Sequence, residues 1–109
     1  MSGGELKTYL CRLRAPRPNF IADMSAEERS LMQAHIAFWQ PHFADGTAVA
    51  LGAVVEATGA SWGLGIFRAP DDAALGELIA QDPVIAADKG FSYEVGVMPR
   101  GVMLGKTPA

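Results

Sequence analysis

The sequence of 109 residues has only one cysteine and two histidines. A single cysteine excludes a disulfide framework within the chain, and Cys and His are too few for a Cys-rich zinc module. The 9 basic and 12 acidic residues give a formal net charge of −3 and form no block of one sign. Nucleic-acid binding needs a basic stripe that displaces counterions from phosphates. The composition therefore argues against a nucleic-acid partner.

Long apolar runs and targeting signals are also missing. The longest apolar stretch, residues 48–55, is much shorter than the ~20 residues that span a bilayer. The first residues lack the basic start and the apolar stretch of a secretory signal. We therefore expect a cytoplasmic protein that has no membrane partner.

What remains is the composition of a small folded domain. Half of the residues (50%) are hydrophobic and only 19% are charged, which is typical of a chain that buries a core. The length fits a single domain of residues 1–109. We expect its core over about residues 6–99 and a C-terminal tail over residues 100–109.

Hydrophobic periodicity and turn residues divide the chain into strands and helices. Alternating apolar and polar side chains predict strands, and apolar residues three or four apart predict helices. Ser25 and Glu28 form a predicted capping box, and Pro41 is expected to kink the first helix or end its regular part near Gln40. We expect strands at residues 6–14, 47–56, 61–69 and 91–97, a long loop at 15–24, and helices that begin after Ser25 and Asp71.

This order of elements predicts an α+β, ferredoxin-like βαββαβ fold, with a four-stranded antiparallel sheet and two helices on one face. The strands at 47–56 and 61–69 carry apolar side chains on both faces. A sheet with one face in water would alternate instead. Because the helices cover only one face, we expect a homodimer in which two sheets pack face to face.

Few residues can carry chemistry. His35 lies in the apolar stripe of the first helix, either as a core histidine bonded to a carbonyl or as a buried group that transfers protons. Asp82 is placed to cap the turn after the second helix, and its carboxylate could instead orient a histidine through Nδ1–H. Arg12 and Arg14 lie on the strand face opposite Cys11, either as a strand-end pair or as an anion clamp for a carboxylate substrate.

Other motifs are weaker. A G-x-S-x-G pattern surrounds Ser61, but a nucleophile elbow needs a strand before the serine and a helix after it, and neither is expected here. Gly63 and Gly65 share one strand face, where glycines mark either the close approach of a ligand or simple helix packing. His42 lies seven residues after His35, too far for both to bind one metal, and no cofactor motif is present. We expect neither a metal nor a cofactor.

Four segments together resemble the YciI-like (YCII-related) proteins: residues 9–13, the helix segment 28–39, the strand at 46–52, and Ala80-Gln81-Asp82-Pro83. The resemblance covers about residues 6–99. Its most specific parts are a histidine in the middle of the first helix and an Asp-Pro after the second. It implies a dimeric α+β barrel and a His–Asp active site at His35 and Asp82. The loop at 15–24 and Val84 depart from the family pattern and bear on the substrate.

Two functions follow as expectations. In the first, Asp82 orients His35, and His35 moves a proton in an elimination, isomerisation or lactone opening, as a lyase or isomerase does. The expected substrate is a small cyclic or aromatic acid, bound by Arg12 and Arg14. In the second, the chain is a non-catalytic module that binds a small ligand or serves as a structural dimer. Fold analogy alone does not separate the two functions.

Overall fold

The structure, a computed structural model, describes residues 5–103. The expected tail at 100–109 therefore lies partly outside the described residues. The elements in chain order are strand β1 (Lys7–Arg14), helices α1 (Phe20–Asp23) and α2 (Ala26–Ala44), strands β2 (Ala48–Val55) and β3 (Ser61–Ala69), helices α3 (Asp72–Ala80) and α4 (Pro83–Ala86), and strand β4 (Ser92–Met98).

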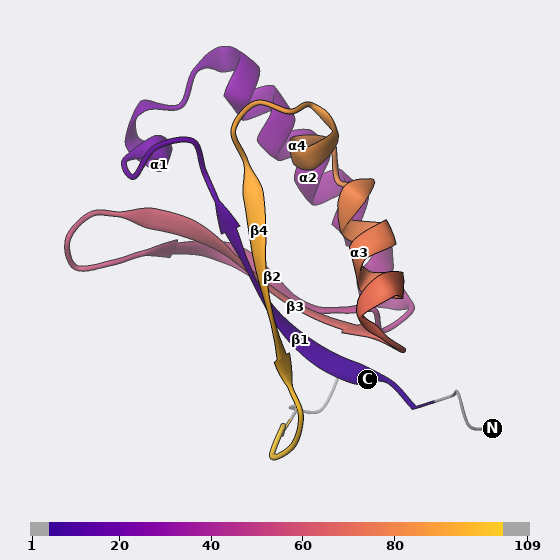
Figure 1. The fold of residues 1–109 in the computed structure, drawn as a ribbon. Helices are drawn as coiled ribbons and strands as arrows, with labels where there is room; N and C mark the ends of the chain where they lie inside the picture. The colour runs from indigo at the N-terminus through magenta and orange to yellow at the C-terminus, as the bar shows by residue number, and fades with distance from the viewer. Residues whose placement is uncertain (1–4, 104–109) are drawn as a thin grey trace.

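The four strands form one antiparallel sheet in the order β2-β3-β1-β4. The helices α2, α3 and α4 lie on one side of this sheet (Figure 1). The predicted α+β, ferredoxin-like fold is confirmed. Within residues 5–103, no helix is long and apolar enough to cross a membrane.

The core lies between the sheet and the helices. The alternation along β1 turns Tyr9, Cys11 and Leu13 toward the helices, and all three are buried. On the same side, the indole of Trp39 from α2 stacks on the ring of Phe67 from β3, with ring centroids 4.0 Å apart. These contacts fix the middle of α2 against the sheet, and His35 lies one turn before Trp39 on this helix.

The predicted helix starts are confirmed. The Ser25 hydroxyl accepts a hydrogen bond from the backbone of Glu28, and the Glu28 carboxylate accepts one from the backbone of Ser25. The Asp71 carboxylate caps α3 by accepting from the backbone N–H of Ala74 at 2.8 Å. Both caps satisfy donors that a helix leaves free in its first turn.

Two expectations about the first half of the chain need correction. An end of the first helix near Gln40 is wrong, because α2 continues through Pro41 to Ala44. Pro41 lacks the N–H that would bond to the carbonyl four residues before it, but the last turn of the helix forms nonetheless. The segment 15–24 is not all loop, because it contains α1, whose Phe20 is buried edge-to-face against Phe91 with centroids 5.2 Å apart. A helix of four residues is too short to show helical periodicity in the sequence.

Candidate active site

His35 projects from the middle of α2 toward the sheet. It is 5% exposed, in keeping with its position in the apolar stripe of the helix. Its Nδ1 lies 2.8 Å from Oδ2 of Asp82, which is 47 residues further along the chain. The structure thus brings together the two residues that the sequence offered as a catalytic pair.

Asp82 is fully buried at the start of α4 and accepts four hydrogen bonds. Its Oδ1 accepts from the backbone N–H of Val84 at 3.1 Å, as a helix cap does. Its Oδ2 lies 2.8 Å from the His35 ring and accepts from the indole N–H of Trp39 at 2.7 Å and from the hydroxyl of Tyr93 at 2.8 Å. The carboxylate is therefore a helix cap and a partner of His35 at the same time.

These donors keep Asp82 ionised inside the protein. Burial by itself raises the pKa of the carboxyl group, because it penalises the charged form. Hydrogen bonds from His35 and then Trp39 outweigh burial and hold the pKa of Asp82 below its usual value of 3.8. Burial, followed by the negative charge of Asp82, raises the pKa of Tyr93 well above its usual range. Tyr93 is therefore a hydrogen-bond donor at neutral pH and not an anion.

The carboxylate decides which nitrogen of His35 carries the proton. A neutral imidazole has one N–H donor and one bare nitrogen acceptor. Since an ionised carboxylate only accepts hydrogen bonds, the proton of neutral His35 belongs on Nδ1. The bare nitrogen is then Nε2, on the edge of the ring away from Asp82. A base in this arrangement can accept a proton from a bound molecule.

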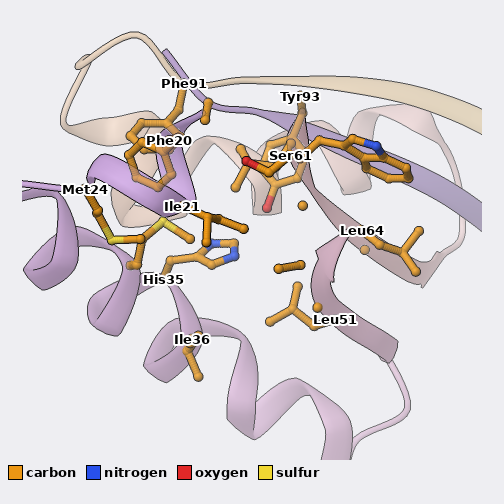
Figure 2. A pocket seen from close by; sticks show the side chains of 18 of the residues that line it. Phe20, Ile21, Met24, His35, Ile36, Leu51, Ser61, Leu64, Phe91 and Tyr93 are labelled. Atoms are coloured by element: carbon orange, nitrogen blue, oxygen red, sulfur yellow. The ribbon is translucent and has the colours of Figure 1, made fainter. Parts of the chain in front are cut away.

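A cavity of about 710 Å³ lies in front of His35, between α2, the segment that carries α1, and strands β2 and β3. This volume lies in the range of small-molecule sites. Figure 2 shows the imidazole of His35 pointing into this space, with the side chain of Ile21 beside it. Most of the lining is apolar, including Phe20, Met24 and Phe91, and the polar lining side chains are His35, Gln40, Ser61 and Tyr93.

Two glycines of β3 lie at one wall of the cavity and leave room for neighbouring core side chains. Gly63 and Gly65 both line it, on the strand face that looks toward the helices. A side chain at Gly65 would collide with the ring of Phe67, and a Cβ at Gly63 would lie 3.1 Å from Cβ of Leu13. The ring of Phe67 and the side chain of Leu13 therefore occupy the space next to these two glycines, and Gly65 is buried.

The arginines that the sequence offered for substrate binding lie elsewhere. Arg12 and Arg14 are on the opposite face of the sheet, and neither lines the cavity. The Arg12 guanidinium sits 4.1 Å from the centre of the Trp62 ring, and Nε of Arg14 lies 3.3 Å from a carboxylate oxygen of Glu94. The predicted anion clamp is therefore not part of this site, because β1 turns alternate side chains to opposite faces.

Sequence reasoning missed the roles of Trp39 and Tyr93 and gave no function to either residue. A signal for Trp39 was present, since residues four apart on a helix share a face and Trp39 follows His35 by four. Tyr93 had a weaker signal, because it lies two residues before Val95 and so shares the same face of the last strand. Only the fold shows that both side chains reach the same carboxylate oxygen.

The second histidine takes no part in this site. His42 lies near the end of α2 with its ring centroid 5.6 Å from those of Phe38 and Trp39, and its Nδ1 is 3.4 Å from Oδ2 of Asp45. Its side chain is 25% exposed, so it is partly packed and not simply a surface residue. Among residues 5–103, no group of three or more His, Cys, Asp or Glu side chains is arranged to hold a metal ion.

Comparison with known proteins identifies the class of domain. The family model of the YCII-related domain matches residues 8–99. The chain therefore belongs to the YCII-related domain family. Among solved structures, a conserved protein from Methanosarcina mazei Go1 is similar with a TM-score of 0.49 and 13% sequence identity, covering 87% of this chain and 93% of that chain. No curated protein matches the chain.

Proposed function

We propose that this protein transfers protons on a small molecule bound in the cavity, with His35 as the general base and Asp82 as its positioning residue. The observation that carries the proposal is the buried His35–Asp82 pair at the wall of an apolar cavity. A histidine held by a carboxylate through Nδ1 resembles the base of many hydrolytic enzymes in geometry. The walls around it are mostly apolar, as in many small-molecule sites.

The proposed reaction needs a group that accepts a proton and a neighbour that stabilises the positive charge formed on that group. Nε2 of His35 accepts a proton from a carbon atom of the substrate, and the ring becomes an imidazolium next to the Asp82 carboxylate. In an isomerisation, the same proton returns to a different atom of the substrate. In an elimination, the electron pair of the broken C–H bond forms a double bond, and the leaving group departs with the electron pair of the bond that joined it to the neighbouring carbon. Both reactions need the same base, so both remain within the proposal.

A deuterium-exchange experiment tests this proposal before the natural substrate is known. Cyclic ketones and lactones, such as 2-cyclohexenone and γ-butyrolactone, are incubated with the protein in D2O, and NMR follows the loss of protons next to the carbonyl. A positioned general base contributes about 10²–10⁴-fold in rate. We expect faster exchange of at least one compound with the wild type, and a loss of this magnitude in His35→Gln.

The matched control is His42→Gln, which makes the same change in a histidine that does not line the cavity. Exchange should proceed in this variant as in the wild type, and both variants should keep the amide NMR spectrum of a folded chain. Equal exchange in the wild type and in His35→Gln would contradict the proposal. The cavity would then support the non-catalytic, ligand-binding module.

We also propose that the chain forms a homodimer through the face of the sheet that the helices leave open. This face carries apolar side chains on its central strands, with Leu10 on β1 and Trp62, Leu64 and Ile66 on β3. Leu10 is 38% exposed in the single chain. A second sheet packed against this face would bury these side chains, and burial of apolar area is the main favourable term in association.

A further inference from the structure

The charge of the cavity wall bears on which class of molecule it takes. No Lys, Arg, Asp or Glu is among the described residues that line the cavity. His35 is therefore the one basic side chain among the lining residues within 5–103. An anionic group in the cavity would have to leave water without a fixed cation to receive it, which is costly.

Three arginines, Arg12, Arg14 and Arg17, lie near cavity-lining residues in the sequence, and all three make other contacts. Arg17 lies in the segment that forms one wall, but its Nε is 2.7 Å from Oδ1 of Asp23 and its Nη2 is 2.7 Å from Oε1 of Glu28. These two carboxylates neutralise it and direct its guanidinium toward α2. Arg12 and Arg14 lie on the face of the sheet opposite the helices.

The charge behind His35 is negative. The buried Asp82 carboxylate lies 2.8 Å from Nδ1. A group that bonds to Nε2 lies one imidazole ring away from this carboxylate. Two like charges at such a distance repel each other strongly where protein replaces water. The negative charge of Asp82 thus disfavours an anionic ligand group at Nε2 of His35 and is compatible with a neutral hydrogen-bond donor there.

The walls favour an apolar ring compound. Phe20 and Phe91 present aromatic surfaces, and Met24 adds a thioether that suits contact with rings. On the other side, Leu51 of β2 adds an aliphatic side chain. A ring system without charge can make van der Waals contact with these walls.

From these observations we infer that the cavity selects a neutral ring compound with a proton donor that faces Nε2 of His35, and rejects the corresponding carboxylate. This inference rests on the proposed function for the location of the site and replaces the cyclic acid that the sequence led us to expect. It concerns the charge of the ligand and does not depend on whether a proton is transferred.

A pair of probes with the same ring system and different charge tests it. At pH 7, 2-naphthol is neutral and 2-naphthoate is an anion, and both carry the same two fused rings. NMR titration of the wild type, read at the amides of Gly63 and Gly65, gives the Kd of each probe. We expect 2-naphthol to bind at least tenfold more tightly than 2-naphthoate.

A change of charge in the wall sharpens the test. Gln40 lines the cavity from α2, so Gln40→Lys places a cation there. We expect this variant to tighten the binding of 2-naphthoate at least fivefold and to change the Kd of 2-naphthol by less than twofold. The matched control is Gln33→Lys, the same substitution at an exposed position of α2 that does not line the cavity, and it should leave both constants unchanged.

The inference is overturned if 2-naphthoate binds the wild type as tightly as 2-naphthol, or if neither probe binds. It is also overturned if Gln33→Lys tightens 2-naphthoate as much as Gln40→Lys does. The proposed function fails by a different result, namely equal deuterium exchange in the wild type and His35→Gln. The ratio of the two Kd values is not affected by that result.

Discussion

At the scale of single residues, Asp82 combines two tasks on its two oxygen atoms. Oδ1 caps α4, while Oδ2 accepts hydrogen bonds from His35, Trp39 and Tyr93. A buried carboxylate with this many donors is stabilised in its ionised form. The cap fixes where the carboxylate lies, and the side-chain donors fix which way Oδ2 points.

Tyr93 is expected to act on the site through Asp82. Tyr93→Phe removes one donor from a buried carboxylate, and a hydrogen bond to a charged group contributes about 1.5–3 kcal/mol. We expect the free energy of unfolding to fall by about this amount in urea denaturation, and deuterium exchange to slow several-fold.

Tyr9→Phe is the matched control, because the Tyr9 hydroxyl donates to Oδ1 of Asp72 at 2.7 Å, away from the cavity. This variant should lose stability without any change in exchange rate. If the two variants slow exchange equally, Tyr93 has only a structural role.

The candidate pair could be predicted at this scale, and its surroundings could not. A histidine in an apolar helix stripe and an Asp-Pro after the second helix were visible in the sequence and gained meaning from the family resemblance. Arg12 and Arg14 were considered as an anion clamp, because guanidinium groups pair well with carboxylates. The alternation of β1 had already placed them on the face opposite Cys11, and helix packing then put His35 on the side of Cys11.

At the scale of elements, the segment with α1 forms one wall of the cavity and is held by two contacts made just before α1. The backbone N–H of Ser61 donates to the carbonyl of Pro18 at 2.9 Å, which ties the segment to the start of β3. Arg17 ties it to α2 through Glu28, with N–O distances of 2.7 and 2.8 Å. The wall therefore depends on contacts that no local pattern in the sequence specifies.

The charge state of Glu28 should report on this contact. The hydrogen bond from Arg17, followed by that from the backbone of Ser25, lowers the pKa of Glu28 from 4.5 to about 2. A carboxyl group with a lowered pKa stabilises the folded state above its usual pKa, and this contribution is lost as the pH falls. The tie between α1 and α2 should thus weaken as the pH falls from 4.5 toward 2.

In Arg17→Ala, we expect the pKa of Glu28 to rise toward 4.5, as measured by NMR titration of its side-chain carboxyl. Hydrogen exchange at the amides of α1 should become faster at neutral pH. The capping bond from Ser25 remains in this variant, so the rise should be incomplete. An unchanged pKa would show that Arg17 does not hold Glu28 in solution.

At the scale of the whole molecule, the sheet separates two surfaces with different tasks. The helix side holds the core and the cavity, and the open side carries apolar side chains on its central strands together with Arg12 and Arg14. The sequence predicted this architecture well, because strand alternation, helix caps and turn residues all agree on one order of elements. The details that it missed, α1 and the end of α2, depend on tertiary packing around Phe20 and His42.

The open face should determine the oligomeric state. Ile66→Glu puts a charge in the middle of this face, where dimer formation would have to bury it at high cost. We expect light scattering to give a dimer for the wild type at micromolar concentration and a monomer for Ile66→Glu.

Val97→Glu is the matched control, since Val97 is 49% exposed on the other face of the sheet, and it should leave the dimer intact. A wild type that is monomeric at this concentration would contradict the proposed dimer.

The central claim is that Asp82 holds His35 with Nε2 free to accept a proton from the cavity. Nitrogen NMR of the His35 ring tests it most directly, because the chemical shifts of Nδ1 and Nε2 show which of them carries the proton in the neutral ring. We expect the proton on Nδ1 in the wild type, and we expect Asp82→Asn, whose amide can donate as well as accept, to redistribute it between the two nitrogens. A proton on Nε2 in the wild type, or the same distribution in both proteins, would show that Asp82 does not hold His35 in this way.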